Sequence, residues 1–154
     1  MLKVVINGAL GKMGREVGVA VRGASDMAIE RELDIANNLE EYLSRNQVDV
    51  VVDFTQPEGR MDRVRAILNN GASAVIGTTG FTDEDLAEIE KLCKAKKKGC
   101  IIAPNFAIGS VLLMKFAQQA AKYFSTAEII EYHHNQKAEY CHPDEQFEKR
   151  LACL

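Results

Sequence analysis

The fold is decided by a stretch near the N-terminus that reads Lys3-Val4-Val5-Ile6-Asn7-Gly8-Ala9-Leu10-Gly11-Lys12-Met13-Gly14. Residues 3–7 form a β-branched run typical of a buried strand, and apolar residues recur at helical spacing from Gly11 to Ala24. A glycine-rich turn between a strand and a helix lets backbone N–H groups approach a pyrophosphate. The spacing is G-x-x-G-x-x-G, and such glycines serve an ordinary tight turn equally well.

The same alternation of strand and helix continues along the chain. We predict further strands over 27–34, 48–54, 72–77, 100–103 and 128–132, and helices over 39–45, 57–71, 82–98 and 108–124. The weakest of these strands is 27–34, because its Glu30, Arg31 and Glu32 are unusual inside a parallel sheet. The alternation predicts an α/β fold with a doubly wound, mostly parallel sheet of the Rossmann type.

Signals at helix ends support these boundaries. Pro57 predicts the first turn of a helix that Gly71 ends. Thr82 and Asp85 have the spacing of a capping box at the start of the next helix. The lysines that precede Gly99 predict a helix C-terminus with a glycine cap, which accounts for this basic run without a partner.

Composition excludes several classes of protein. The 154 residues are 47% hydrophobic and 27% charged, and 19 Lys+Arg against 22 Asp+Glu give a net charge of −3. This balance provides no long-range attraction to nucleic acid or to an anionic membrane. No apolar run reaches the roughly 20 residues of a membrane span. We expect a cytoplasmic protein with no nucleic-acid partner, no membrane partner, four reduced cysteines and no metal.

Asp34 is the first candidate ligand residue outside the glycine turn. It follows Gly14 by 20 residues, where a dinucleotide-binding fold holds the ribose hydroxyls. The alternative is a solvated turn acid paired with Asn37 or Asn38. Ile35 follows it, so the position that would hold an arginine for a 2′-phosphate carries no cation.

Three loops that follow predicted strands carry small, polar and aromatic residues, and the two after the predicted strands 72–77 and 100–103 suit the carboxamide and ring of a nicotinamide. The three loops read Asp53-Phe54-Thr55-Gln56-Pro57, Gly77-Thr78-Thr79-Gly80-Phe81 and Ala103-Pro104-Asn105-Phe106-Ala107-Ile108-Gly109. Ligands of open α/β sheets bind beyond the carboxyl ends of the strands, which is where these loops begin. Each loop also has an ordinary explanation as a turn or a helix start.

The last candidate segment is His133-His134-Asn135-Gln136-Lys137, after the predicted strand 128–132. A histidine and a lysine four residues apart offer a proton donor and a cation, which reduction of an unsaturated acid needs. A histidine pair is also common as plain surface residues.

Together these segments resemble the 4-hydroxy-tetrahydrodipicolinate reductase family, also called dihydrodipicolinate reductases. The resemblance rests on Gly8 to Gly14, Asp53-Phe54-Thr55, Val75 to Phe81, Ala103 to Phe106 and Glu131 to Lys137, which follow in the family's order across residues 2–137. It implies an NADH- or NADPH-dependent oxidoreductase of lysine and diaminopimelate biosynthesis. Its substrate would be a cyclic unsaturated dicarboxylate.

The resemblance also implies a role for each site residue. The cofactor would contact Gly8, Ala9, Leu10, Gly11, Lys12, Met13, Asp34, Phe54, Gly77, Thr78, Thr79, Ala103, Pro104, Asn105 and Phe106. His133 and Lys137 would be the catalytic proton donors, and His134 would bind a substrate carboxylate. Because no arginine follows Asp34, we expect NADH to bind at least as well as NADPH, with Lys12 as a substitute partner for the 2′-phosphate.

The resemblance implies a dinucleotide-binding domain over 1–106, the start of a substrate domain over 107–137 and a divergent tail over 138–154. After Lys137 the family continues with Asp-Ala-Pro-Ser-Gly-Thr, whose Gly-Thr binds the substrate, whereas this sequence reads Ala138-Glu139-Tyr140-Cys141-His142-Pro143. We therefore expect a chain truncated or divergent after Lys137, lacking most of the domain through which the family forms homotetramers, with weak or no turnover.

Two alternatives stay open beside the reductase. One is a non-catalytic dinucleotide-binding remnant, and the other is a Rossmann module that supplies cofactor to a partner chain. Exposed apolar surface on the helix from Val111 to Phe124 would be the sign of the second.

Overall fold

The computed structural model describes residues 1–103, 105–124 and 126. The chain divides into two compact units between Pro104 and Asn105. The predicted strand 128–132, the predicted tail, and the candidate residues Pro104, His133, His134 and Lys137 lie outside the described residues.

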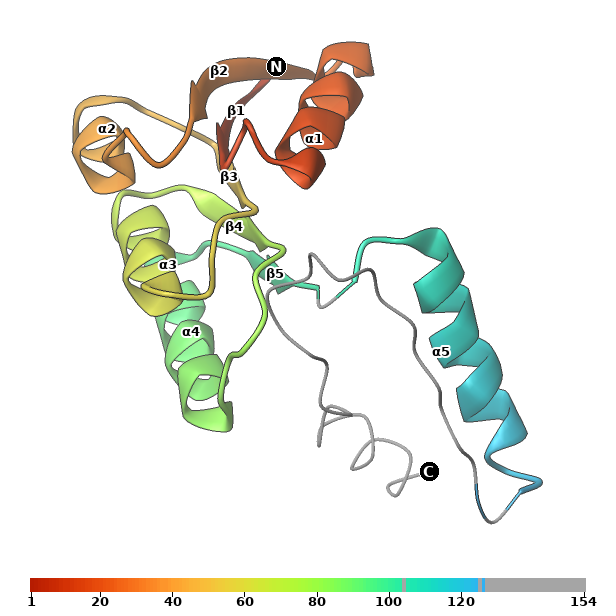
Figure 1. The fold of residues 1–154 in the computed structure, drawn as a ribbon. Coiled ribbons are helices and arrows are strands. Elements are labelled where there is room, and N and C mark those ends of the chain that lie inside the picture. The colour runs from red at the N-terminus through yellow and green to blue at the C-terminus, as the bar shows by residue number, and fades with distance from the viewer. Residues whose placement is uncertain (104, 125, 127–154) are drawn as a thin grey trace. The chain divides into compact units, whose positions relative to one another are not determined.

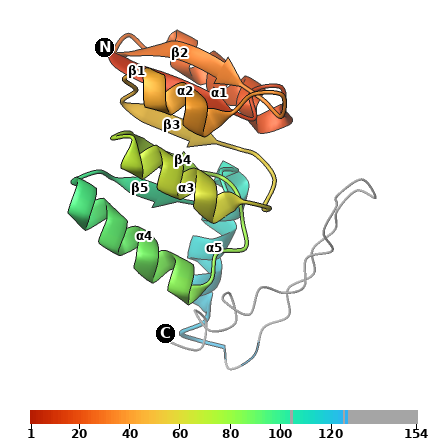
Figure 2. The same ribbon diagram turned by 90° about the vertical axis from the view of Figure 1, so that its left-hand side faces the viewer.

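The first unit is a parallel sheet with helices on both faces. Its strands are β1 (Leu2–Asn7), β2 (Met27–Leu33), β3 (Val50–Asp53), β4 (Ser73–Ile76) and β5 (Cys100–Ile102), in the order β2-β1-β3-β4-β5. Its helices are α1 (Lys12–Gly23), α2 (Leu39–Arg45), α3 (Arg60–Asn69) and α4 (Asp83–Lys96). Helix α1 lies on one face, and α2, α3 and α4 lie on the other (Figures 1 and 2). The predicted doubly wound α/β fold is confirmed.

The strands end side by side at one edge of the sheet. Asn7, the last residue of β1, pairs with Leu33 of β2 and Asp53 of β3. Asp53 pairs in turn with Ile76 of β4, and Ile76 pairs with Ile102 of β5. All the loops that follow the strands therefore begin from one row of residues, the carboxyl edge of the sheet.

The core is built by the alternation of side chains along the strands. Val4 and Ile6 pack with Val21 of α1, whereas Val5 packs with Ile67 and the other apolar residues of α2, α3 and α4. Successive strand residues point to opposite faces, so one buried strand serves both layers. Each such side chain, when fully buried, stabilises the fold by roughly 1.5–3 kcal/mol.

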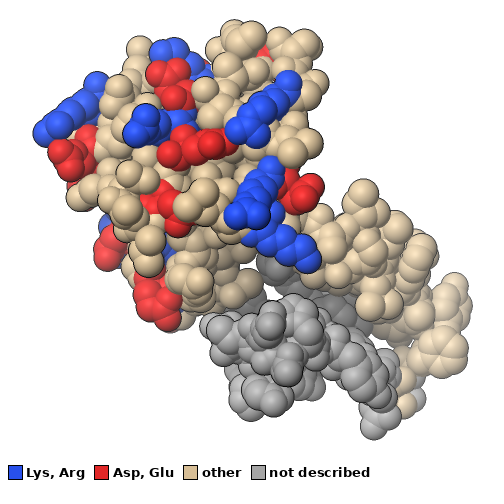
Figure 3. All heavy atoms as spheres, turned by 45° about the horizontal axis from the view of Figure 1, so that its top comes forward, with Lys and Arg blue, Asp and Glu red and all other residues tan. Residues whose placement is uncertain are grey.

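The charged residues of β2 are explained by its position, because β2 forms one edge of the sheet and is less covered than an interior strand. Glu30 lies 3.6 Å from the ammonium of Lys3, and Glu32 pairs with Arg22 of α1. Charged side chains on an edge strand also discourage pairing with other chains. Figure 3 shows acidic and basic side chains interspersed over one face of this unit.

Two residues predicted to mark helix ends have other places in the structure, Pro57 and Gly99. Helix α3 begins at Arg60 and not at Pro57, which lies in a preceding turn closed by a hydrogen bond from the Arg60 N–H to the Pro57 carbonyl (3.2 Å). The left-handed residue that ends α4 is Lys97, with φ of 54°, and not Gly99. Gly99 instead leads into β5 and donates its N–H to the Ser73 hydroxyl (3.3 Å).

The second unit contains α5 (Ile108–Ala120), four residues shorter than the predicted helix. Its large apolar side chains, among them Leu112, Leu113 and Phe116, are exposed. Within the part of the chain that the structure describes, no helix has the length and apolar character that crossing a bilayer requires.

Candidate functional site

The sheet changes direction between β1 and β3. The chain leaves β1 for β2 on one side and leaves β3 for β4 on the other. Such a switch point is where open α/β sheets bind ligands, because the two loops diverge and leave a crevice between them. The loops stay in contact at their bases, since a Cβ on Gly8 would lie 2.7 Å from the Phe54 carbonyl oxygen. Gly8 also has φ of +85°, so a glycine is required there.

The three glycines of the turn after β1 have different constraints. A Cβ on Gly14 would lie 2.1 Å from the Gly8 carbonyl oxygen, so α1 packs directly on the turn. A Cβ on Gly11 would meet only that same oxygen, at 3.3 Å. Packing therefore accounts for Gly8 and Gly14, whereas Gly11 is the least constrained of the three, because a Cβ there would need a shift of only a few tenths of an ångström.

The N–H groups of the turn are largely committed within the protein. Those of Gly8 and Ala9 donate to the Leu33 carbonyl (2.9 and 3.0 Å), and that of Gly11 donates to the Gly8 carbonyl (3.2 Å). Helix α1 begins next, with Gly11 as its N-cap and no side-chain cap. The first N–H groups of a helix have no intrahelical partner. The donors that this site offers to an anion are therefore those of Lys12, Met13 and Gly14, because the next one, of Arg15, donates to the Gly11 carbonyl (3.1 Å).

Asp34 is attached to the glycine turn. Its Oδ2 accepts a hydrogen bond from the Leu10 N–H (2.7 Å), and its Oδ1 accepts one from the Ile35 N–H (2.8 Å). These bonds, Ile35 first and then Leu10, hold the pKa of Asp34 below its ordinary value of 3.8. The Asp34 N–H also donates to Asn37 Oδ1 (2.9 Å), so the predicted turn pairing is present. A carboxylate has about four acceptor sites, which leaves capacity for ribose hydroxyls.

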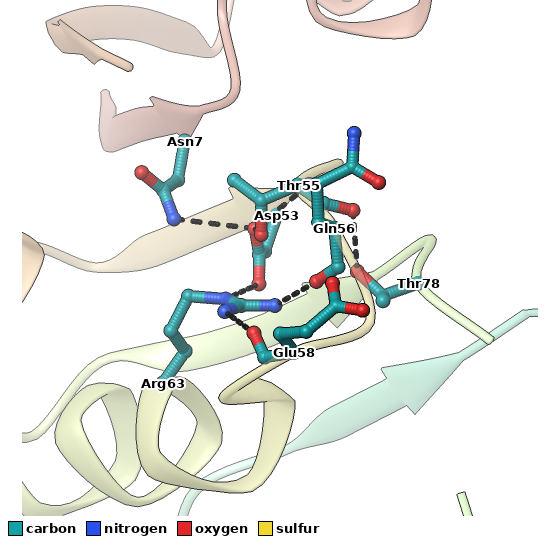
Figure 4. A network of polar contacts seen from close by, with 7 residues as sticks. All are labelled: Asn7, Asp53, Thr55, Gln56, Glu58, Arg63 and Thr78. Carbon is teal, nitrogen blue, oxygen red and sulfur yellow. Dashed lines mark hydrogen bonds and ion pairs between the residues drawn. The ribbon is translucent and has the colours of Figure 1, made fainter. Parts of the chain in front are cut away.

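A buried polar network lies where β3 ends (Figure 4). The Asp53 side chain is 1% exposed, and its Oδ1 accepts from Asn7 Nδ2 (3.2 Å) and from the Thr55 hydroxyl (2.7 Å). Its Oδ2 accepts from Nε of Arg63 in α3 (2.9 Å). A buried carboxylate needs such partners because burial of an unpaired charge is very unfavourable. Arg63 was not among the predicted site residues, because a helical arginine ten residues away from Asp53 has no distinctive sequence signal.

The loop after β4 packs against the loop after β3. A Cβ on Gly77 would lie 2.0 Å from the ring of Phe54, so that ring lies directly on the Gly77 backbone. Thr78 is buried, and its hydroxyl donates to the Thr55 carbonyl (3.3 Å), whereas Thr79 is exposed. The loop predicted to line the nicotinamide after β4 is thus in contact with the loop after β3.

A second arginine of α3 supports the end of that loop. The Arg60 guanidinium lies over the Phe81 ring, 5.4 Å from its centroid, and donates to Asp85 Oδ2 (3.2 Å). Phe81 is buried, so this contact fixes the point where the loop enters α4. Like Arg63, Arg60 has no sequence signal that marks it as a support of a loop.

The carboxyl edge of the sheet therefore brings together most of the predicted cofactor-binding residues. The residues at or next to this edge are Gly8, Ala9, Leu10, Gly11, Lys12, Met13, Asp34, Phe54, Gly77, Thr78, Thr79 and Ala103. Asn105 and Phe106 belong to the second unit, where Asn105 Oδ1 accepts from the Ala107 N–H (3.0 Å) just before α5.

Comparisons with known proteins point to one family. A family model described as "Dihydrodipicolinate reductase, N-terminus" matches residues 2–106. A 4-hydroxy-tetrahydrodipicolinate reductase of Coxiella burnetii is 44% identical over 136 residues, which cover 88% of this chain and 57% of that protein. The corresponding protein of Mycolicibacterium smegmatis is 45% identical over 139 residues, which cover 90% and 56%. The chain thus spans about 57% of the length of the curated relatives it matches.

Solved structures show the same similarity. A dipicolinate-bound dihydrodipicolinate reductase from Paenisporosarcina sp. TG-14 matches with a TM-score of 0.74 and 36% identity, covering 99% of this chain and 64% of that chain. An NAD-binding protein from Listeria innocua matches with a TM-score of 0.62 and 20% identity, covering 77% and 40%, which shows a shared fold alone.

Proposed function

The chain belongs to the dihydrodipicolinate reductase family, and we propose that its first unit binds NADH or NADPH for reduction of 4-hydroxy-tetrahydrodipicolinate, a cyclic unsaturated dicarboxylate. The bound nicotinamide would supply a hydride. The observation that carries the proposal is the switch point between β1 and β3, where a glycine turn leads into a helix without a side-chain cap. The reaction belongs to lysine and diaminopimelate biosynthesis.

The pyrophosphate would lie at the N-terminus of α1. The first-turn N–H groups there are donors, the helix dipole is positive, and no acidic residue stands in the first turn. Gly11 would let the phosphates approach the backbone, and the exposed Lys12 adds a positive charge. Asp34, charged at neutral pH and tied to Leu10, would hold the adenosine ribose.

The nicotinamide would lie along the loops that follow β3, β4 and β5. Phe54, packed on Gly77, would present an aromatic surface, and Thr78, Thr79 and Ala103 would contribute polar and small groups. We extend the site by family membership to Pro104, Asn105 and Phe106. His133 and Lys137 would donate protons, and His134 would bind a substrate carboxylate.

Calorimetric titration of the full chain with NADH tests cofactor binding. In Gly11→Val the added side chain should obstruct the pyrophosphate and weaken binding at least about tenfold, or roughly 1.4 kcal/mol. The fold should persist, because the φ of Gly11 is −69° and a Cβ there would meet a single atom at 3.3 Å, which needs a shift of only a few tenths of an ångström. Gly23→Val is the matched control, because a Cβ at that end of α1 meets nothing within 4 Å. Equal affinity of the two variants would contradict the proposed site.

The choice between the two cofactors depends on Asp34. Its carboxylate should repel a 2′-phosphate, and the neighbouring Ile35 offers no cation, so NADH should bind at least as tightly as NADPH. Titrations of wild type and Asp34→Asn with both cofactors give the ratio. A clear preference of wild type for NADPH, or an unchanged ratio in the variant, would count against this role. Lys12→Ala measures any contribution of Lys12 to the 2′-phosphate.

Turnover separates the reductase from a non-catalytic dinucleotide-binding remnant, since both bind the cofactor. If the chain is a reductase, a coupled assay with NADH and enzymatically generated substrate should show weak oxidation of NADH that His133→Ala abolishes. Cofactor binding without any turnover would favour the remnant.

A further inference from the structure

We propose that Arg63 is a positioning residue for the dinucleotide site, because it clamps the loop 54–58 at the switch point. This inference rests on the proposed cofactor binding. The loop carries Phe54 and Thr55, and its base contacts the glycine turn at Gly8. Arg63 lies on α3, outside the loops that would touch the cofactor, and it acts through the loop that it holds.

The guanidinium of Arg63 has three partners, all at one end of β3 (Figure 4). Its Nε donates to Asp53 Oδ2 (2.9 Å), its Nη1 to the Glu58 carbonyl (2.6 Å), and its Nη2 to the Gln56 carbonyl. The side chain is only 19% exposed, so most of its donors are used within the protein. A planar fork of five N–H groups can hold three acceptors in fixed directions, which an ammonium cannot reproduce.

The clamp extends to the loops on both sides. Asp53 also accepts from Asn7, the residue before Gly8, and from the hydroxyl of Thr55. The Thr55 carbonyl in turn accepts from the hydroxyl of Thr78 in the loop after β4. Hydrogen bonds thus connect Arg63 to the ends of β1 and β3 and to the loop after β4, the segments that would surround the cofactor.

Charge compensation alone does not explain this geometry. The bond from Nε is sufficient to pair the buried carboxylate of Asp53. The other two hydrogen bonds go to the uncharged main-chain carbonyls of Gln56 and Glu58. Both residues are exposed to water, so their carbonyls do not need an arginine as a partner. What these bonds determine is the path of the loop, and through it the placement of Phe54 on Gly77.

The substitution Arg63→Lys separates charge compensation of Asp53 from the positioning of the loop 54–58. A lysine keeps a positive charge near Asp53, but it cannot also hold both carbonyls in the directions of the fork. Arg65→Lys is the matched control, since Arg65 lies two residues further along α3 and bonds to Asp62 (2.9 Å) and to Glu88 of α4 (2.7 Å). None of its hydrogen bonds in the described structure goes to the loop 54–58.

Calorimetry with NADH on the full chain provides the test, with hydrogen exchange of the amides of residues 54–58. We expect Arg63→Lys to raise the Kd for NADH about tenfold at unchanged stoichiometry, which is the effect of losing one charge-assisted hydrogen bond. We also expect the amide hydrogens of the loop to exchange faster. Arg65→Lys should match wild type in both. A role in folding alone would lower the stoichiometry of binding and leave the Kd of the folded fraction unchanged.

The outcomes distinguish this inference from the proposed function. If wild type binds NADH and Arg63→Lys binds it with the same Kd, the positioning role is wrong while the cofactor site stands. A lowered stoichiometry at unchanged Kd also overturns the positioning role. If wild type does not bind NADH or NADPH, the proposed function fails, and the positioning role fails with it.

Discussion

Helices α1 and α4 both begin at the carboxyl edge of the same sheet, yet their N-termini are built differently. The Thr82 hydroxyl accepts from the Asp85 N–H (3.1 Å), and Asp85 Oδ2 accepts from the Thr82 N–H (3.0 Å), which completes the predicted capping box. Three acidic residues occupy the first turn of α4. Helix α1 begins at Gly11, with no side-chain cap and no acidic residue in its first turn.

The N-terminus of α4 has its backbone N–H groups capped by its own side chains, whereas that of α1 has no side-chain cap. A side-chain N-cap stabilises a helix by about 1 kcal/mol, and an acid near the N-terminus adds roughly 0.3–1 kcal/mol. The N-terminus of α1, at the switch point of the sheet, has neither a side-chain cap nor an acidic residue in its first turn. Departures from local stability rules concentrate at functional sites, and an anionic ligand would supply the negative charge that α4 provides for itself.

The largest effect is expected where α1 meets the turn. In Gly14→Ala the new Cβ would lie 2.1 Å from the Gly8 carbonyl oxygen and 2.7 Å from the Ala9 Cα, so the backbone must move. We expect urea unfolding to show a loss of about 3 kcal/mol, as for severe overpacking. Gly23→Ala, where a Cβ meets nothing within 4 Å, should retain or gain stability. Equal stability of the two variants would mean that α1 does not pack on the turn in this way.

The next prediction concerns a substitution that makes the N-terminus of α1 resemble that of α4. Gly11→Asp places a carboxylate at the N-cap, where it should repel the pyrophosphate, whereas Gly11→Asn has nearly the same shape and no charge. We expect NADH to bind at least about tenfold more weakly to the aspartate variant than to the asparagine variant, with a difference that shrinks at high salt. Identical affinities would show that the cofactor phosphates do not lie at this helix end.

The reverse change at α4 should affect stability and not the site. Thr82→Ala removes one half of the capping box, and we expect the free energy of unfolding to fall by about 1 kcal/mol with the affinity for NADH unchanged. Thr82→Ser should restore the stability, because a serine hydroxyl can cap in the same way. Weaker NADH binding by Thr82→Ala at full saturation would mean that the two helix ends are not independent.

The same contrast indicates how far the sequence predicts the site. Hydrophobic periodicity and capping signals predicted the parallel sheet and the start of α4, because both depend on residues that are near one another in the sequence. Strand β2 was the weakest of the predicted strands, because its charged residues are explained only by its position at the edge of the sheet. The roles of Gly8, Gly11 and Gly14 could not be separated, because the difference lies in atoms brought close by folding. Arg63 was missed for the same reason, since its partner Asp53 is on another element.

The smallest effect concerns the carboxylates that bond to backbone N–H groups in these two regions. Asp85 accepts from Thr82 at α4, and Asp34 accepts from Leu10 in the turn before α1. Backbone hydrogen bonds lower the pKa of both side chains from the ordinary value of 3.8. A folded pKa below the unfolded one stabilises the fold at pH values above the unfolded pKa, and this stabilisation is lost as the pH falls through the folded pKa.

Thermal unfolding of wild type and Asp34→Asn at several pH values tests this assignment for Asp34. An asparagine oxygen can keep at most part of the bonding to Leu10 and Ile35, so the variant should melt at a lower temperature than wild type at pH 7. Because the pKa of Asp34 lies below 3.8, the gap in melting temperature should be the same at pH 7 and pH 5. It should narrow only below about pH 4, where the carboxylate of the unfolded chain takes up a proton more readily than that of the folded chain. A gap that does not narrow below about pH 4, or that widens as the pH falls from 7 to 5, would mean that the bonds from Leu10 and Ile35 do not hold Asp34 in its charged form. The turn before α1 would then lack the fixed negative charge on which the preference for NADH depends.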